Sequence, residues 1–169
     1  MNAFARFMTP VFAALALANA VPAAALEAPA GKVILTVSGK IAEKNTATAA
    51  DFDLAMLEKL PQKTFTTNTP WDKNPIKFTG PLLRDVLAAT KASGTQIKAV
   101  AVNDYATTIP LADTKQFDMV LAHKMNDQPI PSRTKGPLFI VYPFDSKPEL
   151  KAKMYEDRSP WQVRTLNIE

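Results

Sequence analysis

The chain has no cysteine among its 169 residues, so no disulfide bond can stabilise its fold. Its stability must therefore come from an apolar core. If the first 25 residues are removed, 144 remain, which is a typical length for a single domain. A domain of that size buries about 68–70% of the surface that its unfolded chain exposes. We therefore predict one domain over residues 26–169, folded around its own core.

Residues 1–25 are predicted to be a cleavable signal peptide. Arg6 supplies a positive charge, the apolar run over 7–17 is short for a membrane span, and small residues allow cleavage after Ala20 or Ala25. A membrane anchor that stays attached is the less favoured alternative. No later apolar run is long enough to cross a membrane, and lipid attachment would need a cysteine. We therefore expect a soluble mature protein without a membrane span, in the periplasm or secreted.

The charge pattern argues against nucleic-acid binding. Lys and Arg number 20 against 16 Asp and Glu, which gives a net charge of +4. The basic residues are scattered along the chain, with Lys151 and Lys153 the nearest approach to a run. Scattered charge is typical of an ordinary solvated surface, so no nucleic-acid partner is expected.

The order of predicted elements indicates an α+β fold. Apolar and β-branched patterns predict strands over 32–39, 63–69, 96–102, 119–125, 138–142 and 161–168. The run over 138–142 is continuously apolar, as is typical of a central strand. Short helices are expected up to residue 59, after residue 80 and over 149–155, with a single helical turn within 111–117.

Turn and cap residues separate these elements. Asp51 or Asp53 is expected to cap the first helix. Thr79 or Gly80 is expected to cap the second, with Pro81 at its first position and Gly94 closing it. Two turns complete the pattern, at Asn103-Asp104 before a strand that ends near Pro110, and at Asn126-Asp127 within a hairpin.

Five segments in this order resemble the molybdopterin-binding domain of sulfite-oxidase-type oxidoreductases. They are Gly-Pro-Leu-Leu-Arg-Asp-Val-Leu over 80–87, Asn103-Asp-Tyr105, Ile109-Pro110, Arg-Thr-Lys-Gly-Pro-Leu over 133–138, and Ser159-Pro-Trp161. The similarity extends from Val33 to Ile168 and is greatest to the small, exported, single-domain members. It implies a mixed β-sheet with short helices, and molybdopterin as a possible cofactor.

The resemblance also suggests residues that could bind a ligand. Arg133 and Lys135 could hold an anion such as the pterin phosphate, since an Arg fork matches phosphate oxygens. Gly136 beside them allows close approach of a ligand or of a neighbouring segment. The alternative for the basic pair is ordinary exposed charge beside a strand.

Three further candidates lie in turn-rich segments. Trp71, in a loop with Asn68, is expected at the rim of a pocket, although a loop packed on the core would have the same sequence. Tyr105 combines an apolar ring with a hydroxyl group, so it suits a pocket wall and a core position equally. Asn103 and Asp104 are expected to serve their turn, and the only histidine, His123, is expected to be structural.

The missing cysteine argues against a bound metal. In the family that the chain resembles, a cysteine thiolate usually helps to hold the molybdenum, and it belongs to the segment that here reads Thr-Phe-Thr-Thr-Asn-Thr over 64–69. Neutral oxygens do not replace a soft anionic ligand. Arg6 also stands alone, without the arginine pair of the twin-arginine route by which such enzymes are exported already loaded. The secretory route exports unfolded chains, which cannot carry a buried pterin.

Three functions follow as hypotheses. The first is a binding, accessory or sensory protein of the cell envelope that lacks molybdenum and binds a small polar or anionic ligand, or a partner protein. The second is a molybdopterin-dependent oxidoreductase of sulfite-oxidase type with a metal ligand other than cysteine. The third is a subunit that completes a partner enzyme. No catalytic residue and no metal-binding residue is predicted.

Overall fold

The computed structural model describes residues 26–169, and the predicted signal peptide lies outside the described residues. Eleven short strands and a few short helices confirm the expected α+β class. The strands are β1 (Leu35–Gly39), β2 (Ala50–Phe52), β3 (Gln62–Thr67), β4 (Ile76–Pro81), β5 (Gln96–Ala101), β6 (Ala106–Pro110), β7 (Val120–Ala122), β8 (Lys124–Met125), β9 (Gln128–Pro129), β10 (Phe139–Val141) and β11 (Val163–Ile168). The helices are α1 (Leu54–Lys59), α2 (Leu83–Ala89), α3 (Asp113–Gln116), the 3₁₀ turn η1 (Pro148–Lys151) and α4 (Lys153–Asp157).

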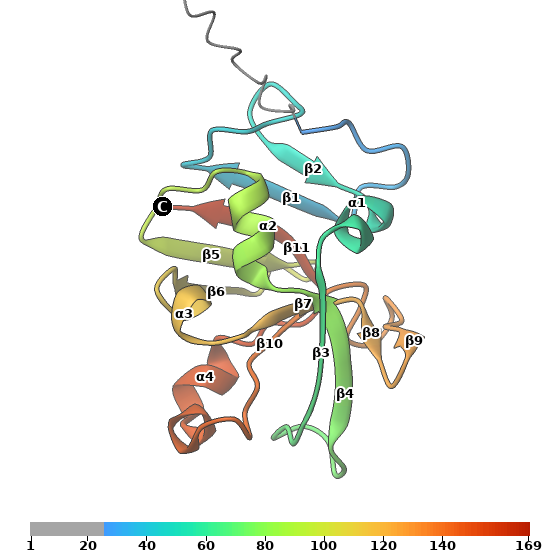
Figure 1. Cartoon of the computed structure of the whole chain (residues 1–169), viewed down its shortest axis with the longest axis vertical. Coiled ribbons are helices and arrows are strands. Elements are labelled where there is room, and N and C mark those ends of the chain that lie inside the picture. Colours follow the sequence, from blue (N-terminus) through green and yellow to red (C-terminus); the bar gives the residue numbers. More distant parts are fainter. Residues whose placement is uncertain (1–25) are drawn as a thin grey trace, which may run out of the picture.

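The largest sheet has five strands in the order β2-β1-β11-β5-β6. The last strand of the chain, β11, lies at its centre, parallel to β1 and antiparallel to β5. Helix α2 lies across this sheet (Figure 1). Alternate residues of β1 and β5 are buried, as expected for strands that face a core on one side. The sheet therefore fixes the end of the chain, including the segment that leads into β11.

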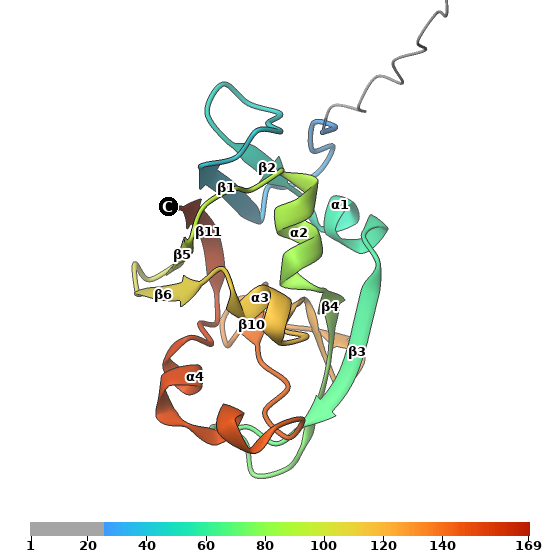
Figure 2. The same cartoon turned by 60° about the vertical axis from the view of Figure 1, so that its left-hand side comes forward.

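The rest of the molecule is a four-stranded sheet, β3-β4-β8-β9, and a two-stranded sheet, β10-β7. In Figure 2 the long β3–β4 hairpin and α4 lie on opposite sides of the lower half of the molecule. The segment 138–142 was expected to be a central strand; β10 forms a ladder with β7 and, on its other side, a single isolated bridge from Phe139 to Trp161. Its three residues are nonetheless all buried, because the surrounding elements cover both of its faces.

The expected start of the second helix is wrong. Thr79, Gly80 and Pro81 belong to β4, and α2 begins at Leu83 after an N-cap at Leu82 that makes no side-chain hydrogen bond. Strand pairing determines the structure of this region, because β4 pairs with β3 over six residues and also pairs with β8. Gly80 is needed for packing, since a Cβ there would collide with the carbonyl group of Leu121. Tertiary pairing therefore overrides the local helix-start pattern.

The other end of this helix also differs from expectation. Helix α2 stops at Ala89, its C-cap is Thr90, and Lys91 adopts a positive φ of 49°. Gly94 lies beyond the helix, against the carbonyl oxygen of Glu169. Lys91 therefore makes the left-handed turn that was expected of the glycine.

Several local predictions are confirmed. Asp53 caps α1 and accepts a hydrogen bond from the Met56 amide at 2.8 Å. Asp104 has a positive φ of 64° in the β5–β6 turn, and Asn126 and Asp127 have positive φ between β8 and β9. Such pairs of residues favour tight hairpin turns. The helix expected over 149–155 is divided instead into η1 and α4, with Ala152 in an extended conformation between them.

One apolar core connects the sheets, and its largest fully buried side chains include Tyr142, Phe52, Phe78 and Phe139. The Tyr142 hydroxyl donates to Asp113 Oδ2 at 2.7 Å, and Arg158 also donates to this oxygen at 3.0 Å. This cluster joins the end of α4 to the core. Among residues 26–169, no helix is long and apolar enough to cross a membrane.

Candidate ligand pocket

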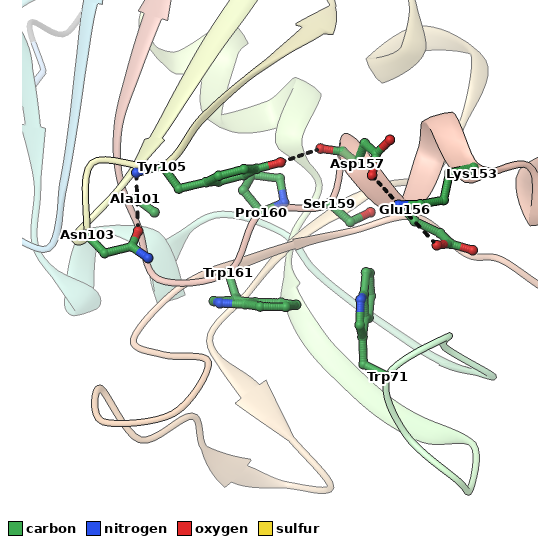
Figure 3. Close-up of a pocket in the computed structure, with 10 residues that line it drawn as sticks. All are labelled: Trp71, Ala101, Asn103, Tyr105, Lys153, Glu156, Asp157, Ser159, Pro160 and Trp161. Atoms are coloured by element: carbon green, nitrogen blue, oxygen red, sulfur yellow. Dashed lines mark hydrogen bonds and ion pairs between the residues drawn. The ribbon is translucent and has the colours of Figure 1, made fainter.

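A pocket with a cavity volume of about 270 Å³ opens where three segments meet. Trp71 comes from the β3–β4 loop, and Ala101, Asn103 and Tyr105 come from the β5–β6 hairpin. The remaining lining residues are Lys153, Glu156 and Asp157 of α4 and residues 159–161 before β11. Figure 3 shows these side chains around the cavity. The volume is near the lower limit of small-molecule sites, about 300 Å³.

Aromatic rings form much of the pocket wall. Trp71 and Trp161 pack edge to face, with ring centroids 5.5 Å apart and planes at 89°. Trp71 also contacts Phe139 and Phe144 of the core, at 5.7 and 5.9 Å between centroids. In the view of Figure 3, the rings of Tyr105 and Trp161 lie on opposite sides of the space, and Trp71 stands upright beside Trp161. The core thus supports the two tryptophan rings. The Tyr105 side of the pocket is open to solvent, since Tyr105 is 49% exposed.

Lys135 holds the two tryptophan segments in place. Its ammonium donates to Asp72 Oδ2 at 2.7 Å, next to Trp71, and its carbonyl oxygen accepts from the Gln162 amide at 3.0 Å, next to Trp161. Burial alone would raise the pKa of Asp72, but hydrogen bonds from Lys135 and Thr69 outweigh burial and lower the pKa. Asp72 therefore remains an ionised partner for Lys135 at neutral pH.

The charged side chains of the pocket lie on α4. Lys153 Nζ donates to the Asp157 carboxylate and lies 3.6 Å from Glu156 Oε2. The hydrogen bond to Asp157 raises the pKa of Lys153 above its usual 10.5, so the ammonium stays charged. One lysine and two carboxylates leave a net charge of −1 among the lining residues.

The structure brings together two of the candidate residues and separates the other four from the cavity. Trp71 and Tyr105 line the pocket. Asn68 instead bonds to Asp145 Oδ2 through its amide and its side chain, at 2.6 and 2.9 Å. Arg133 is exposed, and neither Arg133 nor Lys135 lines the cavity. Lys135 supports the pocket indirectly, through its contacts with Asp72 and Gln162.

Gly136 packs against the chain itself. A Cβ at this position would collide with the carbonyl oxygen of Ile130, so the close approach expected at this glycine is made by a neighbouring segment. Of the two possibilities that the sequence left open for Gly136, a ligand or a neighbouring segment, the structure shows the neighbouring segment. The glycine therefore supports the loop that carries Lys135.

The sequence did not single out Trp161, Glu156 or Asp157 as pocket residues. Trp161 had a detectable signal, because it is the second of only two tryptophans in the chain. Glu156 and Asp157 had none, since acidic residues at the end of a short helix are common on any surface. Only the tertiary fold brings these carboxylates to the Trp71 loop.

The 64–69 segment, which corresponds to the segment with the metal-binding cysteine in the family that the chain resembles, does not fit a molybdenum centre. Thr64 Oγ1 hydrogen-bonds to Thr79 Oγ1 at 2.9 Å, and Thr67 Oγ1 accepts from the Asp145 amide at 3.0 Å. Thr69 Oγ1 donates to Asp72 Oδ2 at 2.8 Å. These donors are neutral hydroxyl groups already bonded within the protein, whereas molybdenum in such a site needs a soft anionic ligand. The chain supplies no thiolate elsewhere, because it has no cysteine.

His123 is structural, as expected from the sequence. It is buried, and its Nε2 lies 2.9 Å from Gln62 Oε1. The Gln62 side-chain amide donates to the carbonyls of Leu57 and Leu60, so Oε1 is the acceptor and His123 the donor. Within the described part of the chain, no group of three or more His, Asp or Glu side chains could hold a metal ion.

The fold and the family comparison define the class of protein. Residues 31–144 match the family model of the oxidoreductase molybdopterin-binding domain, and the chain belongs to this family. The chain matches none of the curated proteins with which it was compared. The family match ends before α4, so six of the ten pocket-lining residues, from Lys153 to Trp161, lie beyond it.

Proposed function

We propose that the protein is an exported, soluble binding protein of the cell envelope that has the sulfite-oxidase-type fold but holds no molybdenum. Its ligand is a small polar molecule bound in the pocket that Trp71, Trp161 and Tyr105 line. One observation carries this proposal: a small aromatic pocket is present in a family member whose 64–69 segment offers only neutral oxygens. A binding protein needs the pocket, whereas an oxygen-transfer enzyme also needs the metal ligand.

An accessory or sensory role with an envelope partner protein is the second candidate. Five large apolar side chains are exposed on the described residues, and three of them, Val102, Tyr105 and Met154, lie on the segments that form the pocket. Apolar groups around a pocket mouth favour contact with another protein. In this role, ligand binding would change the surface that the partner contacts.

A thermal-shift screen tests the proposed binding function. The protein is expressed from the complete 169-residue sequence and heated with small anionic, zwitterionic, neutral and cationic compounds. We expect at least one class to raise the Tm of the wild type, because a ligand that binds only the folded state stabilises it. The Trp71→Ala variant should lose this shift.

Two control variants sharpen the screen. Leu111→Ala changes a half-buried apolar residue away from the pocket and should keep the ligand-induced shift. Arg133→Ala tests the anion-binding role expected from the sequence, and it should also behave as the wild type. If no class shifts the Tm, or if Trp71→Ala shifts as much as the wild type does, the pocket is not the binding site.

A further inference from the structure

We infer that the ligand of this pocket is a small organic cation with an ammonium or methylated ammonium head group. This inference rests on the proposed binding function and names the ligand class of the same site. Three features carry it: the aromatic walls, the net charge of the lining, and the positions of the basic residues that would otherwise hold an anion.

The aromatic walls suit a cation. Both tryptophans of the chain and Tyr105 line one small cavity. The face of an aromatic ring carries negative charge density, and tryptophan attracts a cation most strongly. Because Trp71 and Trp161 are set at 89° to each other, their rings present differently oriented surfaces to one cavity. Rings arranged on several sides of a space are the usual way to bind a methylated ammonium group.

The charged lining residues add to this preference. The two carboxylates of Glu156 and Asp157 outnumber the one ammonium of Lys153, so the lining has a net charge of −1. The Lys153 ammonium already lies between these two carboxylates, hydrogen-bonded to Asp157 and 3.6 Å from Glu156. The acidic pair thus has the geometry to hold an ammonium group. Since the Lys153 side chain is 75% exposed, it can move into solvent when a ligand replaces it.

No free basic group faces the cavity to hold an anion. Among the described residues that line it, Lys153 is the only basic one, and it is paired. Arg133 does not line the cavity, and the Lys135 ammonium bonds to Asp72. A phosphate or carboxylate would therefore enter a pocket of net negative charge without an Arg or Lys to bind it. The lining opposes anions and favours cations.

The backbone beside the pocket supports a functional site. Gln162 has a positive φ of 53° and directly follows the lining residue Trp161. Positive φ is costly for residues with a side chain and tends to occur at sites where a side chain must be placed for function. The Gln162 amide donates to the Lys135 carbonyl oxygen at 3.0 Å, directly after Trp161, which lines the cavity.

Choline and its uncharged isostere 3,3-dimethylbutan-1-ol test the inference. Binding of each to the protein expressed from the complete sequence is measured by titration calorimetry and by tryptophan fluorescence. We expect choline to bind about threefold to thirtyfold more tightly than the isostere, because only choline gains the cation–π attraction. Inorganic phosphate serves as the anionic probe and should not bind.

Substitutions test which residues determine the preference for choline. Trp71→Leu keeps an apolar surface but removes the ring, so it should reduce the preference for choline over the isostere. Glu156→Gln should weaken choline binding without changing isostere binding. Glu149→Gln, an exposed carboxylate on η1 outside the pocket, is the matched control and should leave both unchanged. Lys153→Gln removes the competing ammonium and should strengthen choline binding a few-fold, since the lining charge becomes more negative.

The outcomes separate this inference from the proposed function. If phosphate or the isostere binds as tightly as choline, and Trp71→Leu abolishes that binding, the pocket is a ligand site but the ligand is not a cation. If choline does not bind to the wild type, the inference is overturned. If choline binds but no pocket variant changes its affinity, both the inference and the pocket assignment fail.

Discussion

The ammonium of Lys135 lies 2.7 Å from Asp72 Oδ2, and this contact connects the two segments that carry the pocket tryptophans. Both side chains are only about one-fifth exposed. The carbonyl of Lys135 bonds at the same time to Gln162, beside Trp161. A residue expected to bind an anion is thus a positioning residue for the pocket. Its replacement gives the first prediction.

Lys135→Met should destabilise the protein by about 1–3 kcal/mol, because Asp72 would lose its partner in a half-buried position. Ligand-induced stabilisation should also fall, since the Trp71 loop would no longer be tied to the Trp161 segment. Urea unfolding measures the first effect, and thermal shift the second. Lys98→Met replaces an exposed lysine that has no ion pair among residues 26–169, and it is the control. Equal effects of the two variants would contradict the role of Lys135.

Tyr142→Phe should cost about 1 kcal/mol or more at neutral pH, because it removes a buried hydrogen bond to Asp113. Burial, with the nearby Asp113, raises the pKa of Tyr142 well above its usual 10.0. The unfolded chain therefore releases this proton first, and wild-type stability should fall as pH rises above 10.0. The variant should show a smaller alkaline loss.

Tyr155→Phe is the matched control for this prediction. The Tyr155 ring packs 5.2 Å from that of Tyr142, but its hydroxyl makes no hydrogen bond within the part of the chain that the structure describes. Chemical unfolding at a series of pH values measures both variants. An alkaline slope that is the same in Tyr142→Phe and in the wild type would show that Tyr142 does not contribute to it.

His123 should make the protein sensitive to mild acid. Burial lowers its pKa from 6.5, against the opposing effect of Glu58, and Lys124 lowers it further. The unfolded state thus binds a proton before the folded state does, so stability is full above pH 6.5 and decreases as pH falls below it. Since this is the only histidine, the slope at mildly acidic pH is assigned to it. His123→Gln should flatten the slope in urea unfolding; an unchanged slope would exclude His123 as its source.

Gly136→Ala should destabilise the fold, since the new Cβ meets the carbonyl oxygen of Ile130 and the backbone must shift. We expect a loss of about 1–3 kcal/mol, the usual cost of overpacking. Gly31→Ala is a milder control, because its Cβ would lie 3.3 Å from the Asp53 side chain rather than collide with a backbone carbonyl. Thermal unfolding compares the two variants. A neutral effect of Gly136→Ala would show that the glycine is not needed for this packing.

The sequence predicted the local structure best where a residue type determines the backbone. Asp53 as a cap and the Asn126-Asp127 turn are examples, because their side chains or their tolerance of positive φ suffice. It failed at residues 79–81, where a helix-start pattern is overridden by pairing with two other strands. The partners of these residues lie 15 to 19 positions away in β3 and, for Thr79, 45 positions away in β8, which is beyond the reach of a local helix-start pattern.

The pocket was predictable only in part. Trp71 and Tyr105 were identified because an aromatic residue in a turn-rich loop is informative on its own. Glu156 and Asp157 could not be identified, since their approach to Trp71 follows from the route of the chain through β10 and α4. Lys135 was chosen for its charge, but its role depends on Asp72, a partner 63 positions away.

The metal content of the protein purified from the envelope of its native host tests the central claim most directly. Molybdenum is measured by elemental analysis, and pterin by fluorescence after its release from the denatured protein. Since the 64–69 segment offers no thiolate, we predict neither molybdenum nor pterin at a stoichiometric level. Stoichiometric amounts of both would contradict the account and would identify a molybdopterin enzyme with a metal ligand other than cysteine.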